Sequence, residues 1–129
     1  MPTSVMELQP TILVVEDHPL IAMDLADELS DLGYQVLGPF ATVGAARKVL
    51  SITTPDAACL DVKLEDGFSF AFARELLDMG IRTTFLTGQG TLTRLNGVEG
   101  ADVLDKPLAA QKLREHFAII KSSVGASRR

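Results

Sequence analysis

Five polar side chains of this sequence stand at the ends of short apolar runs. They are three carboxylates, a hydroxyl and an ammonium: Glu16 and Asp17 after Ile12–Val15, Asp61 after Ala57–Leu60, Thr87 after Thr84–Leu86, and Lys106 after Val103–Leu104. If these runs are parallel strands of one sheet, their carboxyl ends form one rim, where ligands of α/β proteins bind. Carboxylates suit a divalent cation, and a hydroxyl with an ammonium suits phosphate. The pattern therefore predicts a site for a divalent cation and a phosphoryl group.

The three acids have different expected roles. Glu16 and Asp17 are adjacent, so one could bind Mg²⁺ directly and the other through water, since this cation keeps several waters. Both could instead cap the following helix and complement its dipole. Asp61 ends the central apolar run, and beside a bound cation it would stay ionised and attack phosphorus, giving an aspartyl phosphate. Taken alone, Asp61 fits a turn residue better.

The hydroxyl and the ammonium are expected to hold the phosphoryl group. Thr87 could hydrogen-bond a phosphoryl oxygen, and the small Gly88 would let that group approach the backbone N–H. Lys106 could act as a point charge on phosphate, aimed inward if its bond to Pro107 is cis. Each residue is uninformative alone, because threonine at a strand end and lysine before proline are commonly structural or surface residues. Their joint order along the chain carries the prediction.

Strands must alternate with helices to bring these residues together. Continuous apolar runs predict five buried strands: Thr11–Val15, Tyr34–Leu37, residues 55–60, Arg82–Leu86 and Ala101–Leu104. Apolar residues at helical spacing predict helices: residues 18–32, 42–50, 68–79 and 108–120. Gly88–Gly100 contains four glycines, which predicts one helical turn at most, at Leu92–Leu95. We therefore expect an α/β fold with a doubly wound five-stranded parallel sheet and a short or irregular fourth helix.

Several boundaries have specific expectations. Asp17 is expected to cap the first helix, with Pro19 in its first turn, and Gly38-Pro39 is expected to end the second strand. An apolar stripe is expected on the third helix: Phe68, Phe72, Leu76 and Met79. The lead-in is expected at residues 1–10, one domain at 11–122 and a flexible tail at 123–129.

Composition narrows the function classes. The 129 residues suffice for one domain, and 47% hydrophobic content excludes a disordered chain. The net charge is −5. The end of the chain carries Lys121, Arg128 and Arg129 and no acid, so the remainder has a net charge near −8 (−5 minus 3). Such an acidic body is a poor surface for nucleic acid.

The same composition points to the cytoplasm. The single cysteine, Cys59, excludes an internal disulfide and fits a reducing compartment. No apolar stretch approaches the ~20 residues of a membrane span. The first residues lack the pattern of a secretory signal. We expect a soluble cytoplasmic protein that binds neither membrane nor nucleic acid.

Four segments together resemble the receiver domain of bacterial two-component response regulators: Ile12–Pro19, Leu60–Leu64, Phe85–Gly88 and Asp105–Leu108. The resemblance covers Thr11 to about Ser122 and implies a flavodoxin-like (βα)5 fold. It implies that Asp61 is the phosphoacceptor. It also implies the remaining site: Mg²⁺ bound by Asp17, Asp61 and the Lys63 carbonyl and through water by Glu16, and a phosphoryl group held by Thr87, Gly88 and Lys106.

The resemblance also implies partners. The phosphoryl donor would be a phosphohistidine on a histidine kinase or a histidine phosphotransfer protein. The chain would be a stand-alone receiver, a monomer or weak dimer, that signals to an unknown downstream protein by altered protein–protein interaction. It departs from the family pattern in having Glu65 where proline is common, Val103 where an aromatic is common, and only 19 positions from Thr87 to Lys106.

Three other functions are alternatives to a signalling receiver. A phosphohydrolase with an aspartate nucleophile usually has a second acid two residues later, where this chain has Lys63, and a cap domain. A flavin-binding module would place a phosphate beside Glu16-Asp17, which would repel it. A phosphate sink uses the same chemistry as a signalling receiver without an effector, and the sequence does not separate these two.

Overall fold

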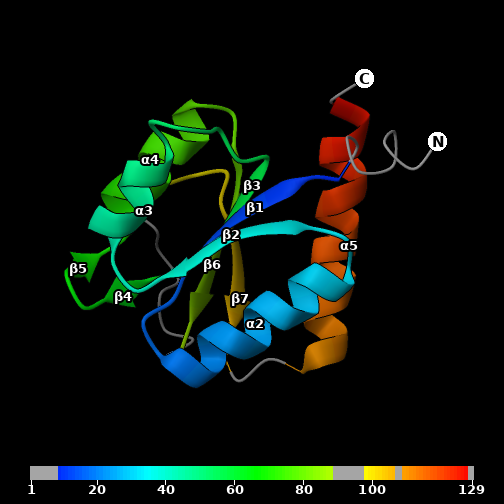
Figure 1. The fold of residues 1–129 in the computed structure, drawn as a ribbon, viewed down its shortest axis with the longest axis horizontal. Helices are drawn as coiled ribbons and strands as arrows, with labels where there is room; N and C mark the ends of the chain where they lie inside the picture. The colour runs from blue at the N-terminus through cyan, green and yellow to red at the C-terminus, as the bar shows by residue number, and fades with distance from the viewer. Residues whose placement is uncertain (1–8, 89–97, 107–108, 128–129) are drawn as a thin grey trace.

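Parallel strands form a central sheet with helices on both faces in the computed structural model, which describes residues 9–88, 98–106 and 109–127 (Figure 1). The sheet runs in the order β2-β1-β3-β6-β7. Its strands are β1 Thr11–Val15, β2 Gln35–Phe40, β3 Ala57–Asp61, β6 Arg82–Thr87 and β7 Asp102–Asp105. A separate hairpin consists of β4 Lys63–Leu64 and β5 Gly67–Phe68. The described helices are α2 Pro19–Asp31, α3 Val43–Val49, α4 Phe70–Asp78 and α5 Ala110–Ser127.

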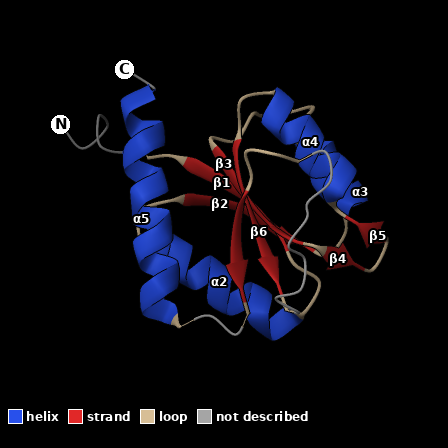
Figure 2. Cartoon of the chain, turned by 180° about the vertical axis from the view of Figure 1, so that it is seen from behind, coloured by secondary structure: helices blue, strands red, loops and turns tan. Residues whose placement is uncertain are grey.

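The doubly wound parallel sheet is confirmed. The first strand lies between the second and third strands of the sheet, so the chain winds to one side and then to the other. Figures 1 and 2 show α3 and α4 on one face and α2 and α5 on the other. The segment expected to carry the short fourth helix, including Leu92–Leu95, lies outside the described residues.

Successive residues of the central strands belong to two different cores. Leu13 and Leu60 pack with α3 and α4, whereas Val14 and Cys59 pack with α2 and α5. All four side chains are buried, because both faces of the sheet are covered. This burial explains why the runs are continuously apolar instead of alternating. Cys59, a free cysteine, is one of these buried core residues.

The second strand corrects one expectation. β2 continues through Gly38-Pro39 to Phe40, although this pair was expected to end it. Proline is tolerated because β2 is an edge strand, where a missing N–H breaks no essential ladder bond. The pairing with β1 shifts by one residue between Leu13 and Val15, and Gly38 has a φ of 105°, which favours glycine.

The helix boundaries correct others. His18, not Asp17, is the N-cap of α2, and its Nδ1 accepts a hydrogen bond from the Ile21 N–H at 3.4 Å. Phe68 is exposed, because it belongs to the hairpin and α4 starts only at Phe70. Met79, the C-cap of α4, is exposed as well. Phe72 and Leu76 are buried as expected.

The last helix extends further than expected. α5 continues to Ser127, where a tail was expected from residue 123. Leu113, Phe117 and Ile120 form its buried stripe, as predicted. No helix in the described parts of the chain is both long and apolar enough to cross a bilayer. The division into residues 1–10, 11–122 and 123–129 stays a prediction.

One buried hydrogen bond joins α5 to the sheet and yields a test. Tyr34, which precedes β2, donates its hydroxyl to the Phe117 carbonyl at 2.6 Å, and Tyr34 is 1% exposed. Tyr34→Phe is expected to lower the free energy of unfolding by about 1 kcal/mol, because a buried acceptor loses its donor. Urea unfolding measures this. Ser51→Ala removes an exposed hydroxyl that also donates to a carbonyl, and it should cost less than about 0.5 kcal/mol; equal losses would contradict the prediction.

Candidate functional site

Glu16, Asp17 and Asp61 meet at the carboxyl ends of β1 and β3. Each offers one carboxylate oxygen, and these three oxygens lie within 4.8 Å of one another. The strands bring them together, since Val15 pairs with Leu60 and the acids directly follow those two residues. The structure thus places the three acids together, as predicted from their positions after the strands.

Lys106 lies in the same cluster. Its Nζ is 2.7 Å from Glu16 Oε1 and 3.4 Å from Asp61 Oδ2. Its backbone N–H donates to the Thr87 carbonyl at 2.7 Å, which continues the pairing of β6 with β7 one residue beyond Asp105. The Lys106 ammonium, which follows the edge strand β7, therefore bridges two of the three carboxylates.

Glu16 is the most buried member of the cluster. Its side chain is 1% exposed, while those of Asp61 and Lys106 are 14% and 18% exposed. Besides Lys106, Glu16 Oε2 accepts the His18 N–H at 3.1 Å. The Glu16 backbone N–H donates to the Phe40 carbonyl at 2.9 Å. Since a buried charge is tolerated only when it is paired and hydrogen-bonded, these contacts explain how Glu16 stays in place.

Burial and neighbouring charges shift the pKa values of two groups in the cluster. Burial and the neighbouring Glu16 raise the pKa of Asp61 to about 6, although Lys106 acts in the opposite direction. Burial would lower the pKa of Lys106, but its bonds to Glu16 and Asp61 outweigh burial, so this pKa is raised. Three acids lie together and one ammonium pairs with two of them, so a second positive charge would be stabilised here.

The residues fit Mg²⁺ in their chemistry. Mg²⁺ prefers oxygen ligands and is commonly bound by one or two carboxylates with water completing its shell. The three converging carboxylates offer such ligands, and part of the site remains open to water at Asp61. Lys63 follows Asp61 by two residues in β4 and is exposed. The contribution of its carbonyl stays a prediction.

Thr87 and Gly88 lie at the same rim, at the end of β6. Thr87 pairs with Asp105 and is 2% exposed. It stands one residue beyond Leu86, which pairs with Asp61, so it is level with the start of the loop after β3. A Cβ added to Gly88 would meet no atom within 4 Å, so the protein itself leaves room for a side chain there. Pro107 lies outside the described residues, so the expected cis bond between Lys106 and Pro107 stays a prediction.

Sequence reasoning missed one residue at this site. The Ser69 hydroxyl donates to the Asp61 carbonyl at 2.7 Å, and Ser69 is fully buried. A serine just before a helix is typical of an N-cap, so no sequence signal pointed to this bond.

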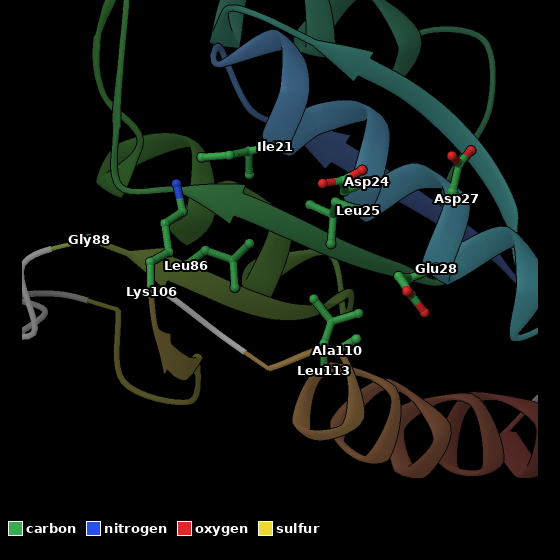
Figure 3. Close-up of a pocket in the computed structure, with 10 residues that line it drawn as sticks. All are labelled: Ile21, Asp24, Leu25, Asp27, Glu28, Leu86, Gly88, Lys106, Ala110 and Leu113. Atoms are coloured by element: carbon green, nitrogen blue, oxygen red, sulfur yellow. The ribbon is translucent and has the colours of Figure 1, made fainter.

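A cleft of about 700 Å³ adjoins the cluster, between α2, the end of β6 and the start of α5 (Figure 3). Its apolar lining includes Leu25, Leu86 and Leu113. Figure 3 shows Lys106 at one end of the cleft and the carboxylates of α2 along another side. Among the four clustered side chains, only Lys106 lines the cleft, so the cleft is beside the acidic cluster and does not contain it.

Comparison with known proteins identifies one family and several similar proteins. A family model described as the response regulator receiver domain matches residues 12–118. The phyllosphere-induced regulator PhyR of Methylorubrum extorquens is 39% identical over 64 residues, which are 49% of this chain and 24% of PhyR. The transcriptional regulatory protein CitB of Klebsiella pneumoniae is 29% identical over 126 residues, covering 91% of this chain and 54% of CitB.

A solved structure is also similar to this chain. The solution structure of SdrG from Sphingomonas melonis Fr1 is similar with a TM-score of 0.73 and 33% identity, covering 88% of this chain and 97% of SdrG. By contrast, the matches to PhyR and CitB span about a quarter and about half of those proteins.

The raised pKa of Asp61 predicts a pH-dependent effect of Asp61→Asn. A carboxyl whose pKa is raised from 3.8 to about 6 contributes stability below pH 3.8 that is lost as the pH rises through 6. Asparagine avoids this loss. With EDTA present, Asp61→Asn should be more stable than the wild type by roughly 1 kcal/mol at pH 7.5, and by less at pH 5, in urea unfolding.

Asp66→Asn is the matched control, with the opposite sign. The N–H groups of Gly44 and Val43 hold the pKa of Asp66 below its ordinary value, so this carboxylate contributes stability above pH 3.8 that is lost on acidification. Asp66→Asn should therefore be less stable than the wild type at pH 7.5. An Asp61→Asn variant that is less stable than the wild type at pH 7.5 would contradict the charge balance described for the cluster.

Proposed function

The chain belongs to the response regulator receiver domain family, and from this premise we propose that it accepts a phosphoryl group on Asp61 and signals through the change that follows. A receiver domain is a phosphoacceptor signalling module and not a classical enzyme. The observation that carries the proposal is the convergence of three carboxylates and the Lys106 ammonium at one rim of the sheet. This acidic triad is typical of the magnesium site of receiver domains.

Asp61 suits the role of nucleophile. Its side chain is reachable from solvent, and it ends the central strand among the other charged groups. We propose that one carboxylate oxygen attacks phosphorus in line with the leaving group. A P–O bond forms and the P–N bond of a phosphohistidine breaks, and its electron pair returns to an imidazole whose other nitrogen carries a proton.

The other residues bind and orient the reacting groups. Glu16, Asp17 and the Lys63 carbonyl would hold Mg²⁺ together with Asp61. Bound Mg²⁺ would keep Asp61 ionised and neutralise charge on the phosphoryl oxygens. The Thr87 hydroxyl and the Gly88 N–H would donate to the phosphoryl group.

Lys106 provides the proposed link to signalling. Once Asp61 is an acyl phosphate, its carboxylate charge is gone and it carries a covalently bound phosphoryl dianion, which would be a stronger partner for the ammonium. Lys106 is bonded through its backbone to Thr87. A movement of Lys106 would therefore shift the carboxyl ends of β6 and β7. Val103 is 40% exposed on β7 and offers no aromatic ring to rotate.

Receiver domains obtain their phosphoryl group from histidine kinases. We propose a histidine kinase or a histidine phosphotransfer protein as the donor, and a downstream protein that distinguishes the two states as the target. A cytoplasmic location is part of the same proposal. The acidic composition argues against nucleic acid as the target of this domain.

Phosphorylation by a small donor tests the role of Asp61. With acetyl phosphate and Mg²⁺, intact-mass spectrometry should show one added phosphoryl group on the wild type, and none in EDTA. Asp61→Asn should show none, because the nucleophile is missing. Asp78→Asn removes an exposed carboxylate from the last turn of α4 and should label like the wild type. Labelling that survives Asp61→Asn would remove Asp61 from the proposed role.

Magnesium affinity tests the place of Lys106. The ammonium competes with a cation for Glu16 and Asp61, so Lys106→Gln should bind Mg²⁺ several-fold more tightly than the wild type, as measured by NMR titration. Lys112→Gln changes an exposed lysine of α5 and should leave the affinity unchanged. Weaker binding by Lys106→Gln would show that the cation lies elsewhere.

A further inference from the structure

The side chain of Ser69 is hydrogen-bonded to the backbone of Asp61 and makes no bond to the helix that Ser69 caps. Its Oγ lies 2.7 Å from the Asp61 carbonyl oxygen and 3.2 Å from the Val62 carbonyl oxygen. The hydroxyl has one proton, which the nearer carbonyl of Asp61 receives at the better distance. The Ser69 backbone N–H donates to the Val62 carbonyl at 2.9 Å. Ser69 thus holds both peptide carbonyls at the end of β3.

This bond replaces a helix cap that serine would ordinarily make. Ser69 is the N-cap of α4, yet its side chain makes no capping bond and its φ and ψ are −94° and 9°. Thr42 shows the ordinary arrangement at α3, with extended backbone and its hydroxyl accepting the Ala45 N–H at 3.1 Å. A missing cap costs about 1 kcal/mol, so the bond to Asp61 must compensate for that loss.

The chain between these two bonded positions is held at its far end as well. The β4–β5 hairpin leaves the sheet after Val62 and returns at Ser69. At its tip, the Asp66 carboxylate accepts the N–H groups of Val43 and Gly44, each at 3.1 Å. The hairpin lies beside α3 in Figure 1, as these bonds require.

The opposite side of the Asp61–Val62 backbone is also fixed. The Val62 N–H donates to the Leu86 carbonyl of β6 at 3.3 Å. β6 therefore holds the N–H of this segment, and Ser69 holds its carbonyls. With both sides bonded, the Asp61 peptide cannot rotate freely, and its carboxylate remains near Lys106 and Glu16.

We propose that Ser69 is a positioning residue for phosphoryl acceptance, which holds the Asp61 backbone so that the carboxylate faces the cation site and the incoming phosphorus. This inference rests on the proposed function of Asp61. Reactive groups must lie in near-attack geometry, and small displacements reduce the rate strongly. Ser69 also supports the proposed Lys63 ligand indirectly, because Lys63 directly follows Val62, whose carbonyl is hydrogen-bonded to Ser69.

The test compares Ser69→Ala with a matched loss of a buried hydroxyl elsewhere. Thr83 is also fully buried, and its hydroxyl donates to the Ile81 carbonyl at 3.0 Å. Thr83 pairs with Ala58, near the amino end of the same strands, so Thr83→Val removes a comparable bond far from Asp61. Ser69→Thr retains the hydroxyl, and Ser69→Cys retains the side-chain size with a weaker donor if Ser69→Ala fails to fold.

Three quantities are measured: urea stability, Mg²⁺ affinity by NMR titration, and the rate of labelling by acetyl phosphate at saturating Mg²⁺. Ser69→Ala should slow labelling about tenfold and weaken Mg²⁺ binding about tenfold. Ser69→Thr should restore both, and Thr83→Val should change only stability. Wild-type labelling rate and Mg²⁺ affinity in Ser69→Ala, or equal effects of Ser69→Ala and Thr83→Val, would overturn the positioning role. A wild type that takes no label would instead overturn the proposed function itself.

Discussion

Two carboxylates that share one ammonium in a half-buried position constrain this end of the molecule. Glu16 and Asp61 both contact Lys106, and Glu16 is almost completely removed from water. In such surroundings like charges repel strongly, so the site has an excess of negative charge that a further cation would stabilise. Binding of a divalent cation and phosphorylation of Asp61 would both change this charge balance. The chemistry of the site and its response to modification therefore have one electrostatic origin.

The sheet topology creates this constraint. β1 and β3 are neighbours, and β6 and β7 follow on the side of β3, so residues distant in sequence reach one rim. Lys106 and Glu16 are 90 positions apart, yet their side chains form the shortest ion pair of the site. The covered faces of the sheet keep the strands rigid, because successive residues pack into two separate cores. Rigid strands hold like charges close together, which flexible segments would not do.

The sequence allowed the sheet and the acids to be predicted because the signals are local. A strand buried on both faces is a continuous apolar run, and a polar residue at its end is visible at once. The contacts that complete the site are harder to predict. The preference of Lys106 for Glu16 depends on where distant segments meet. The His18 cap and the bond from Ser69 to Asp61 join residues close in sequence, but the direction of each side chain is set by the folded backbone. Phe68 was misassigned because its spacing to Phe72 is helical, although its backbone belongs to a hairpin whose tip is bonded to α3.

The hairpin after Asp61 has a further consequence for how this segment tolerates change in length. Hydrogen bonds hold the base of the hairpin at Ser69 and its tip at the first turn of α3, so its length is fixed at both ends. Adding or deleting one residue would leave at least one anchor out of reach. The β4–β5 hairpin therefore acts as a spacer of fixed length between Asp61 and α3. Divergence here should proceed by exchanging side chains at constant length, with Asp66 and Ser69 as the positions least open to exchange.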